Sequence, residues 1–413
     1  MTGEQSLTQV SVPLSNIRPA GPPSLQFASA NPDSVGLAEE ASQWPAAYVH
    51  LPFCARVCPY CDFAVVPGRD DDMARYVHAV ATEIGREEPW QPLVSVYFGG
   101  GTPSRVPPVL LGELLAAIAE RFGIEPGAEV SLEANPEDWT PATSDQLAER
   151  GFERVSFGSQ SFDSGVLSSL GRLHGPKQIA TAVATARSSG FRSVNLDLIF
   201  GTPGETAHRW GATLDQAVAL EPDHVSCYAL TVERGTALGR AVAAGAPAPD
   251  ADLQADFYEM ACQRLGEAGF VRYEVSNWAR PGHASRYNLA VWGQAEYLAF
   301  GMGAHRFRDG FRSHNRRLLD GYLAAIGGGL SPTAGQEPIE GWAAEVERVF
   351  LGIRRVAGVD ARAAGTALLA SEEGQRLVAA GVIELIDGRL MVRRPLLTDH
   401  VARAVLALAP QEC

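Results

Sequence analysis

Short apolar runs alternate with helical patterns along the first half of the chain, and this alternation constrains the fold more than any other feature. We expect six strands, at residues 47–51, 94–98, 130–134, 154–158, 193–200 and 224–230. Between them lie amphipathic segments; after Asp70–Asp72, for example, one helical face carries Met73, Tyr76, Val77, Val80 and Ile84. A strand–helix–strand–helix order predicts a parallel sheet covered by helices.

A faint repeat supports the same fold. Gly151-Phe152, Gly190-Phe191 and Gly269-Phe270 each end a helical pattern and lead into an apolar run. Glycine tolerates the left-handed turn that ends a helix, and the phenylalanine that follows can pack beneath it. We therefore predict an α/β fold, an incomplete TIM-like (β/α)6 barrel over residues 46–240. A doubly wound sheet has the same alternation and is the alternative.

The remaining segments are assigned by composition and pattern. Residues 1–45 are rich in proline and serine, without sustained periodicity, and we expect a flexible N-terminal extension. Residues 241–340 are expected to form an extension that packs against the barrel. Residues 341–413 are expected to form a small helical domain that ends in a β-hairpin turning at Asp387-Gly388. This last pattern resembles a winged helix.

The charge and hydropathy of the chain exclude some classes of function. The 48 Asp and Glu residues outnumber the 34 Lys and Arg residues, for a formal net charge of −14. Such an acidic chain would repel a phosphate backbone, so we expect no nucleic-acid partner. No stretch approaches the roughly 20 apolar residues of a transmembrane helix. With no signal peptide visible at the N-terminus, we expect a cytoplasmic protein.

Three of the six cysteines lie within eight residues, at Cys54, Cys58 and Cys61. Their C-x3-C-x2-C spacing indicates metal binding more than a disulfide framework. Three thiolates can bind three irons of a 4Fe–4S cubane and leave the fourth iron open to another ligand. The alternative is a zinc site with His50 as its fourth ligand, but structural zinc sites usually use two cysteine pairs.

Glycine and polar motifs follow the predicted strands, at the barrel face that carries active sites. The glycines of 99–101 allow close approach of the backbone to a ligand or form a tight turn. Glu133 and Gln160 can hydrogen-bond a polar ligand, and Arg172 can pair with a carboxylate as a bidentate fork. Asp197, in an apolar strand, needs a partner. Salt bridges for Glu133 and Asp197, and a surface position for Arg172, are the structural alternatives.

The segment Tyr48-Val-His50-Leu-Pro-Phe53-Cys54-x3-Cys58-Pro59-Tyr60-Cys61-Asp62-Phe63 resembles the signature of the radical SAM superfamily. It is most similar to the branch that holds oxygen-independent coproporphyrinogen oxidase and the haem chaperone HemW family. The similarity runs from about Tyr48 to about His305. It implies a 4Fe–4S cluster on the three cysteines and S-adenosylmethionine bound by Tyr48, Tyr60, Gly100, Gly101, Thr102, Glu133, Gln160, Arg172, Asp197 and Ala229.

Two features favour the haem-chaperone branch. The oxidase resemblance implies a further cysteine where this chain has Phe63, and a structured N-terminal segment where residues 1–45 show no pattern. The chaperone resemblance implies a His-Asn-x-x-Tyr-Trp motif for haem. The chain keeps Asn288 and Trp292 but has Tyr287 and Val291 at the other positions. Tyr287, Asn288, Trp292 and His305 are the haem candidates, and packing against the barrel is the alternative for Tyr287 and Trp292.

The resemblance therefore implies a haem chaperone that binds haem as cargo and transfers it to an acceptor haem protein, such as a respiratory one. A homodimer is a further expectation. One alternative is an oxygen-independent coproporphyrinogen III oxidase, which would use a radical to decarboxylate propionate side chains. A second is a winged-helix regulator that senses iron–sulfur status, which the acidic composition disfavours.

Overall fold

Six neighbouring parallel strands form the centre of the computed structural model, which describes residues 40–410. Every predicted strand is present, and each pairs in parallel with the next. The strands are β1 (Ala46–Leu51), β4 (Leu93–Gly100), β5 (Ile124–Ala134), β6 (Arg154–Gln160), β7 (Ser193–Phe200) and β8 (His224–Ala229). This confirms the predicted α/β fold with an incomplete barrel of six βα units.

The complete sheet has twelve strands because the segment after the barrel adds strands to both of its edges. Beside β1 lies the parallel strand β11 (Tyr297–Phe300), followed by antiparallel β12 (His305–Arg308), β13 (Phe311–Asn315) and β14 (Thr333–Pro338). Beside β8 lie antiparallel β10 (Asn277–Ala279) and β9 (Val271–Arg272). The terminal strands β14 and β9 do not pair with each other, so the barrel stays open.

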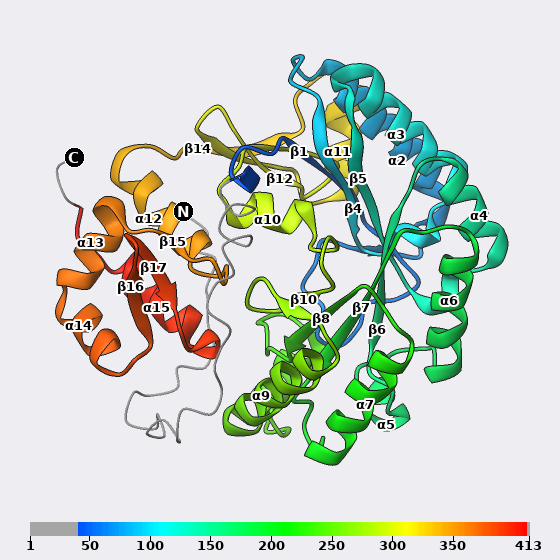
Figure 1. The fold of residues 1–413 in the computed structure, drawn as a ribbon. Helices are drawn as coiled ribbons and strands as arrows, with labels where there is room; N and C mark the ends of the chain where they lie inside the picture. The colour runs from blue at the N-terminus through cyan, green and yellow to red at the C-terminus, as the bar shows by residue number, and fades with distance from the viewer. Residues whose placement is uncertain (1–39, 411–413) are drawn as a thin grey trace.

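Helices cover the outer face of the sheet (Figure 1). They are α2 (Met73–Arg86), α3 (Pro108–Phe122), α4 (Pro141–Glu149), α6 (Pro176–Ser188), α7 (Ala207–Ala219) and α9 (Ala251–Glu267). The predicted apolar face of α2 is buried. Thr140 caps α4 by accepting a hydrogen bond from the backbone of Thr143. The local pattern therefore located α2 correctly.

The Gly–Phe repeat ends three helices in the expected way. Gly151, Gly190 and Gly269 have φ angles of 94°, 90° and 83°, in the left-handed region. The backbone N–H of each following phenylalanine donates to the carbonyl five residues earlier, and its side chain is buried. The repeat thus marks the return from a helix to the next strand.

The C-terminal region has a hydrophobic core of its own, which includes Val349, Leu368, Leu377 and Val401. Its helices are α12 (Gly341–Gly352), α13 (Arg362–Ala370), α14 (Glu372–Ala379) and α15 (Thr398–Leu406). The predicted hairpin is present as antiparallel β16 (Ile383–Ile386) and β17 (Arg389–Val392), and β15 (Val359–Asp360) joins the same sheet. This helix-and-hairpin arrangement matches the winged-helix-like prediction.

Part of the predicted N-terminal extension packs against the folded molecule. Ala41 is fully buried, and the guanidinium of Arg286, at the start of α10 (Arg286–Trp292), lies 5.9 Å from the centre of the Trp44 ring. The rest of the extension lies outside the described residues.

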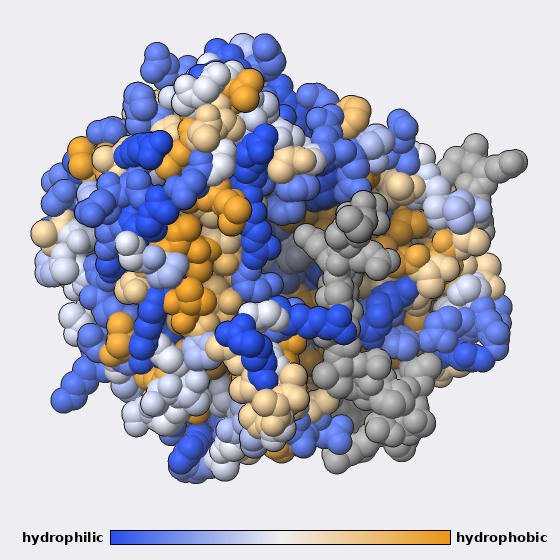
Figure 2. Space-filling model, turned by 180° about the vertical axis from the view of Figure 1, so that it is seen from behind, coloured by the Kyte–Doolittle hydropathy of each residue, from blue (hydrophilic) through white to orange (hydrophobic). Residues whose placement is uncertain are grey.

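No helix of residues 40–410 is long and apolar enough to cross a membrane. Seen from behind, hydrophilic side chains cover much of the surface, with apolar patches between them (Figure 2).

Candidate functional site

The three clustered cysteines lie on one loop at the carboxyl end of β1. Cys54 ends the short strand β2 (Phe53–Cys54), which pairs in parallel with β3 (Val66–Pro67) and thereby ties the two ends of the loop together. Between these ends, the backbone N–H of Cys61 donates to the carbonyl of Cys58 at 3.1 Å. All three thiols are partly exposed. The loop therefore presents three sulfur donors at the mouth of the barrel.

Polar side chains from other strands touch these thiols. Thr102 Oγ1 lies 3.6 Å from Cys54 Sγ, and an Nη atom of Arg172 lies 3.6 Å from Cys58 Sγ. Burial raises the pKa of Cys54 to about 11 and also raises the pKa of Cys61. Thiols with raised pKa values become thiolates here only when a metal displaces their protons.

In this structure His50 is not available as the fourth ligand of the alternative zinc site. His50 Nε2 lies 2.8 Å from the carbonyl oxygen of Ala64, and Nδ1 lies 3.1 Å from the Tyr48 hydroxyl. Both ring nitrogens are therefore engaged. Within residues 40–410, no three His, Cys, Asp or Glu side chains converge on a position that would hold a single metal ion. The donor set of three thiols on one short loop fits a cluster with one open iron.

The glycines at the end of β4 leave room for β1 and for the segment that follows it. A Cβ on Gly101 would lie 2.7 Å from the Pro52 carbonyl carbon, and one on Gly100 would lie 2.5 Å from the His50 ring. Gly100 also has a φ of 117°, which disfavours other residues. The sequence had left open whether these glycines approach a ligand or form a tight turn. A Cβ on Gly101 would meet Pro52 at the start of the cysteine loop, whereas one on Gly100 would meet His50 on β1, so close backbone packing explains both glycines.

Glu133, near the carboxyl end of β5, is a carboxylate that accepts hydrogen bonds from two neutral groups. The Tyr97 hydroxyl donates to one oxygen at 2.8 Å, and the Gly100 N–H donates to the other at 3.0 Å. Burial raises the pKa of Glu133 to about 7, against the effect of these two donors. The sequence analysis missed Tyr97, which lies two residues before Gly99 on β4.

Asp197 on β7 faces the same interior and is also held by neutral groups. The Ser156 hydroxyl donates to its carboxylate at 2.6 Å, and the Asn195 amide donates at 2.9 Å. Burial is the main cause that raises the pKa of Asp197. The negative charge of Asp197 in turn adds to the rise in the pKa of Glu133. The barrel interior therefore holds two carboxyl groups suited to a cationic or hydroxyl-bearing ligand.

Arg172 reaches the mouth from the segment after β6 and is not a surface residue. One Nη atom donates to the Asn135 side-chain oxygen at 2.5 Å and to the Gly158 carbonyl at 2.9 Å. Its Nε is buried and has no hydrogen-bond partner within the described part of the chain. Gln160 has a positive φ of 62°. Its side chain lies beside the same guanidinium, because a Cβ built on Gly158 would contact both of them. An orphaned guanidinium N–H fits a site for a ligand carboxylate.

The other positions implied by the resemblance also surround the mouth. Tyr60 follows Cys58 on the cysteine loop and packs against the apolar cluster around Leu170, and Ala229 is the last residue of β8. Thr102 accepts a hydrogen bond from Asn135, which the sequence analysis did not select. Tyr48 lies deeper, on β1. The structure thus gathers these side chains from β1, β4, β5, β6, β7, β8 and their loops.

The haem candidates, in contrast, separate into two groups. Tyr287 on α10 lies inside the barrel, with its ring stacked on Tyr97 at a centroid distance of 5.0 Å and on Tyr48 at 5.9 Å. Trp292, at the end of α10, lies beneath the guanidinium of Arg354 at 5.2 Å. Tyr287 and Trp292 thus make the packing contacts that were the alternative to haem binding. Asn288 shares α10 with them.

His305 lies on β12, away from this helix. Its ring stacks on that of His314 with centroids 5.2 Å apart, and both side chains are exposed. The structure therefore does not bring His305 together with Tyr287 and Trp292.

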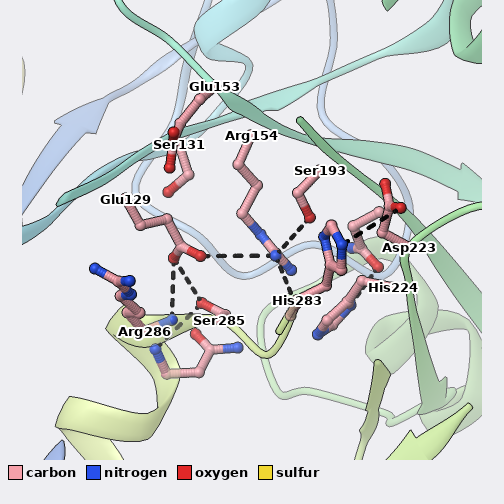
Figure 3. A network of polar contacts seen from close by, with 12 residues as sticks. Glu129, Ser131, Glu153, Arg154, Ser193, Asp223, His224, His283, Ser285 and Arg286 are labelled. Carbon is pink, nitrogen blue, oxygen red and sulfur yellow. Dashed lines mark hydrogen bonds and ion pairs between the residues drawn. The ribbon is translucent and has the colours of Figure 1, made fainter. Parts of the chain in front are cut away.

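The segment that leads into α10 is fixed to the amino ends of the barrel strands by a polar network (Figure 3). Glu129 on β5 accepts a hydrogen bond from the Arg286 N–H at 3.0 Å and forms a buried ion pair with Arg154 at 3.7 Å. Arg154, at the start of β6, also donates to the Ser193 hydroxyl and the His283 carbonyl. This network lies at the end of the barrel opposite the cysteine loop.

A chain of hydrogen bonds connects that network to Asp197. The Ser285 N–H donates to the Tyr273 hydroxyl at 3.3 Å, which lies 2.9 Å from His224 Nε2. His224 Nδ1 lies 2.6 Å from the Asn195 side-chain oxygen, and the Asn195 amide donates to Asp197. Because the Asn195 oxygen can only accept, Nδ1 carries the proton and Nε2 accepts from Tyr273. Burial lowers the pKa of His224 well below its usual value, which favours this neutral form.

Comparison with known proteins agrees with this geometry. Residues 48–217 match the family model of the radical SAM superfamily. A protein of Mycobacterium tuberculosis named heme chaperone HemW is 39% identical over 389 residues, which cover 92% of this chain and 99% of that protein. A Synechocystis protein of the same name is 37% identical, covering 76% of this chain and 79% of that one.

A solved structure gives the same picture of the fold. The structure of coproporphyrinogen III oxidase HemN from Escherichia coli, described as a radical SAM enzyme, superposes with a TM-score of 0.75. It is 21% identical and covers 95% of this chain and 97% of that one. Fold, family match and cysteine loop together define a radical SAM protein. Within that superfamily, the chain belongs to the HemW family.

Proposed function

We propose that this protein is a haem chaperone, which binds haem and transfers it to acceptor haem proteins. The observation that carries the proposal is the 39% identity, over nearly the full length of both chains, to a relative named heme chaperone HemW. In this proposal Cys54, Cys58 and Cys61 hold a 4Fe–4S cluster, and S-adenosylmethionine binds at the barrel mouth. An acceptor in respiration, a homodimer and a cytoplasmic location are further parts of the proposal.

The arrangement of side chains supports cofactor binding at the mouth. Arg172 has a free buried N–H for the methionyl carboxylate, and Glu133 and Asp197 can accept hydrogen bonds from the amino group or the ribose hydroxyls. A reduced cluster, when bound, would supply an electron for cleavage of the sulfonium bond. Tyr60 and the rest of the cysteine loop would limit the access of water to this position.

The second candidate is an oxygen-independent coproporphyrinogen III oxidase, which the HemN-like fold favours. At 21% identity that likeness concerns the fold alone. The residue that separates the branches in the resemblance is Phe63, which here is 63% exposed at the rim of the cysteine loop. A phenylalanine cannot provide the sulfur that the oxidase pattern has at this position, so the chaperone is better supported.

The third candidate, a winged-helix regulator, would need a basic recognition face on the C-terminal domain. Three of its arginines are instead engaged with carboxylates: Arg348 with Glu345, Arg376 with Glu372, and Arg393 with Glu384. These ion pairs reduce the positive charge available to a phosphate backbone, so the structure offers this candidate no specific support.

The proposal is tested by two assays on one anaerobically reconstituted preparation. Haemin titration, followed by the Soret band, should show saturable binding near one equivalent. The same preparation with coproporphyrinogen III, reductant and S-adenosylmethionine should release no carbon dioxide above a control without cluster. Decarboxylation without saturable haem binding would replace the chaperone with the oxidase. The absence of both activities from a cluster-loaded sample would reject both candidates.

A further inference from the structure

The altered motif on α10 leaves the source of the iron ligand open, and the structure argues against Tyr287. A tyrosine ligates haem iron as a phenolate. Burial raises the pKa of the Tyr287 phenol well above its usual value, and its ring is stacked against both Tyr97 and Tyr48. Withdrawing the ring to meet a porphyrin would break both of these stacking contacts. A donor outside α10 therefore needs to be considered.

Two histidines on neighbouring strands form such a donor pair. His305 on β12 and His314 on β13 are directly opposite each other in the antiparallel register. Their rings lie 5.2 Å apart with an angle of 22° between the ring planes, and both side chains are exposed. On β14, a Cβ at Gly335 would lie 2.4 Å from the His314 ring, so this glycine makes room for the imidazole. Imidazole is the commonest protein ligand of haem iron.

The histidine pair adjoins the cysteine loop. Two residues before His305, a Cβ on Gly303 would lie 3.0 Å from the Ala64 side chain, and three residues after His314, Arg317 donates to the Asp62 carbonyl at 2.6 Å. Phe63 lies between these two contacts, and its side chain is 63% exposed. The rim of the mouth therefore combines imidazoles, an exposed aromatic ring and an exposed guanidinium.

We propose that His305 and His314 provide the imidazole ligand for haem iron in this chain, with Phe63 beside the porphyrin and Arg317 near a propionate. This site rests on the proposed chaperone function and assigns its cargo to the rim of the mouth. Haem needs an apolar contact for its ring, a cation for its propionates and a nitrogen donor for its iron, and these three chemistries occur together here. Because the imidazoles are side by side, only one can occupy an axial position of a given iron.

The surroundings of His305 favour its neutral ring. Although the His305 side chain is exposed, partial desolvation by its neighbours lowers its pKa, and His314, Arg312 and Arg317 add to this effect. Metal ligation requires the neutral ring. Arg312 donates a hydrogen bond to Glu347 at 2.7 Å. Arg317 donates one hydrogen bond to the Asp62 carbonyl, and its other N–H groups can donate to an anion.

The test is haemin titration of the reconstituted full-length protein and its variants, with resonance Raman or EPR detection of histidine ligation. The double variant His305→Ala/His314→Ala should raise the Kd for haemin by at least about tenfold and lose the histidine signature. Tyr287→Phe should keep the Kd within about twofold. His78→Ala and His208→Ala, which remove exposed histidines on α2 and α7, serve as matched controls. Iron–sulfur absorbance and the melting temperature verify folding, and His305→Gln/His314→Gln repeats the test with less loss of volume.

The outcomes separate this inference from the proposed function. Loss of haem binding in Tyr287→Phe, with binding intact in the double variant, would overturn the histidine site but leave a chaperone. Failure of the unaltered protein to bind haemin would overturn both. Titration with Ni²⁺ gives a further arm: if Ni²⁺ binds the pair in cis without displacing haemin, the histidines form a metal-ion site and the haem assignment is wrong. Competition between Ni²⁺ and haemin supports it.

Discussion

At the residue scale, Arg172 has a buried N–H without a hydrogen-bond partner among residues 40–410. Its Nη atom is satisfied by Asn135 and Gly158, but its Nε has no partner. A planar guanidinium group that donates some of its hydrogen bonds within the protein can donate the remaining ones to a ligand carboxylate. A lysine ammonium cannot reproduce this geometry. The sequence motif indicated this role, and the orphaned atom gives it a physical basis.

We predict that Arg172→Lys raises the Kd for S-adenosylmethionine by about tenfold, roughly 1.4 kcal/mol, while the cluster is retained. Isothermal titration of the anaerobically reconstituted protein measures the change. Arg192→Lys is the control, because Arg192 pairs with Glu153 on the surface. Unchanged affinity in Arg172→Lys would remove this residue from the binding site.

Glu133 should make the binding of S-adenosylmethionine dependent on pH. Because burial raises its pKa to about 7, the side chain is protonated at pH 6 and ionised at pH 8. The ionised form is the better acceptor for a cationic ligand, so we expect the affinity to rise by up to about tenfold from pH 6 to pH 8. Glu133→Gln should flatten this rise. A profile that is identical in both proteins would assign the dependence to another group.

The same pKa shift has an opposite consequence for the ligand-free protein. A carboxyl group with a raised pKa binds its proton more tightly in the folded state, so its contribution to stability is greatest below the unfolded pKa. This contribution is lost as the pH rises towards 7. Ligand binding and intrinsic stability should therefore respond to pH in opposite directions in this region.

At the element scale, the hydrogen-bond chain from Ser285 through Tyr273, His224 and Asn195 joins the start of α10 to the carboxylate of Asp197. The chain crosses from the amino ends of the strands towards the mouth. Every donor in it points towards Asp197, so each bond supports the orientation of the next. It fixes Asp197 and α10 relative to one another.

We predict that Tyr273→Phe lowers the free energy of unfolding by about 1–3 kcal/mol and weakens S-adenosylmethionine binding several-fold. The variant removes one hydroxyl and leaves the Ser285 N–H and His224 Nε2 unpaired. Tyr258→Phe is a matched control, because its hydroxyl donates to the Val275 carbonyl outside this chain. Denaturant unfolding and ligand titration are measured together. Equal effects on ligand affinity in the two variants would show that the hydrogen-bond chain has no specific role in ligand binding.

At the scale of the whole molecule, the C-terminal domain contacts the barrel through the region around α10. Glu347 on α12 accepts hydrogen bonds from Arg312 on β13 at 2.7 Å and from Gln294 after α10 at 3.1 Å. Nearby, Arg354 lies over the Trp292 ring. The C-terminal domain therefore supports α10, whose Tyr287 stacks on Tyr48 and Tyr97.

We expect Glu347→Ala to lower the free energy of unfolding by about 1–3 kcal/mol, because it leaves a partly buried guanidinium without its carboxylate. Guanidinium chloride unfolding measures this. Glu372→Ala removes an exposed ion pair with Arg376 and should cost less than about 1 kcal/mol. If both variants lose the same small amount, the Glu347 contacts do not hold the two domains together.

The sequence by itself determined the features that depend on local pattern. The six central strands, the apolar face of α2, the Gly–Phe helix ends and the terminal hairpin follow from periodicity and turn residues. The spacing of Cys54, Cys58 and Cys61 indicated one metal-binding loop because the three thiols are close in the chain. The resemblance then supplied the family, which the comparisons confirmed.

Only the tertiary structure decided the contacts between residues far apart in the sequence. Strand β11 is short, with four buried residues, and its parallel pairing with β1 arises from packing and not from a local signal. The location of Tyr287 in a stack with Tyr48 and Tyr97, and the register that sets His305 opposite His314, arise in the same way. Side-chain pairing across strands depends on register, and register is fixed by the packing of the whole sheet.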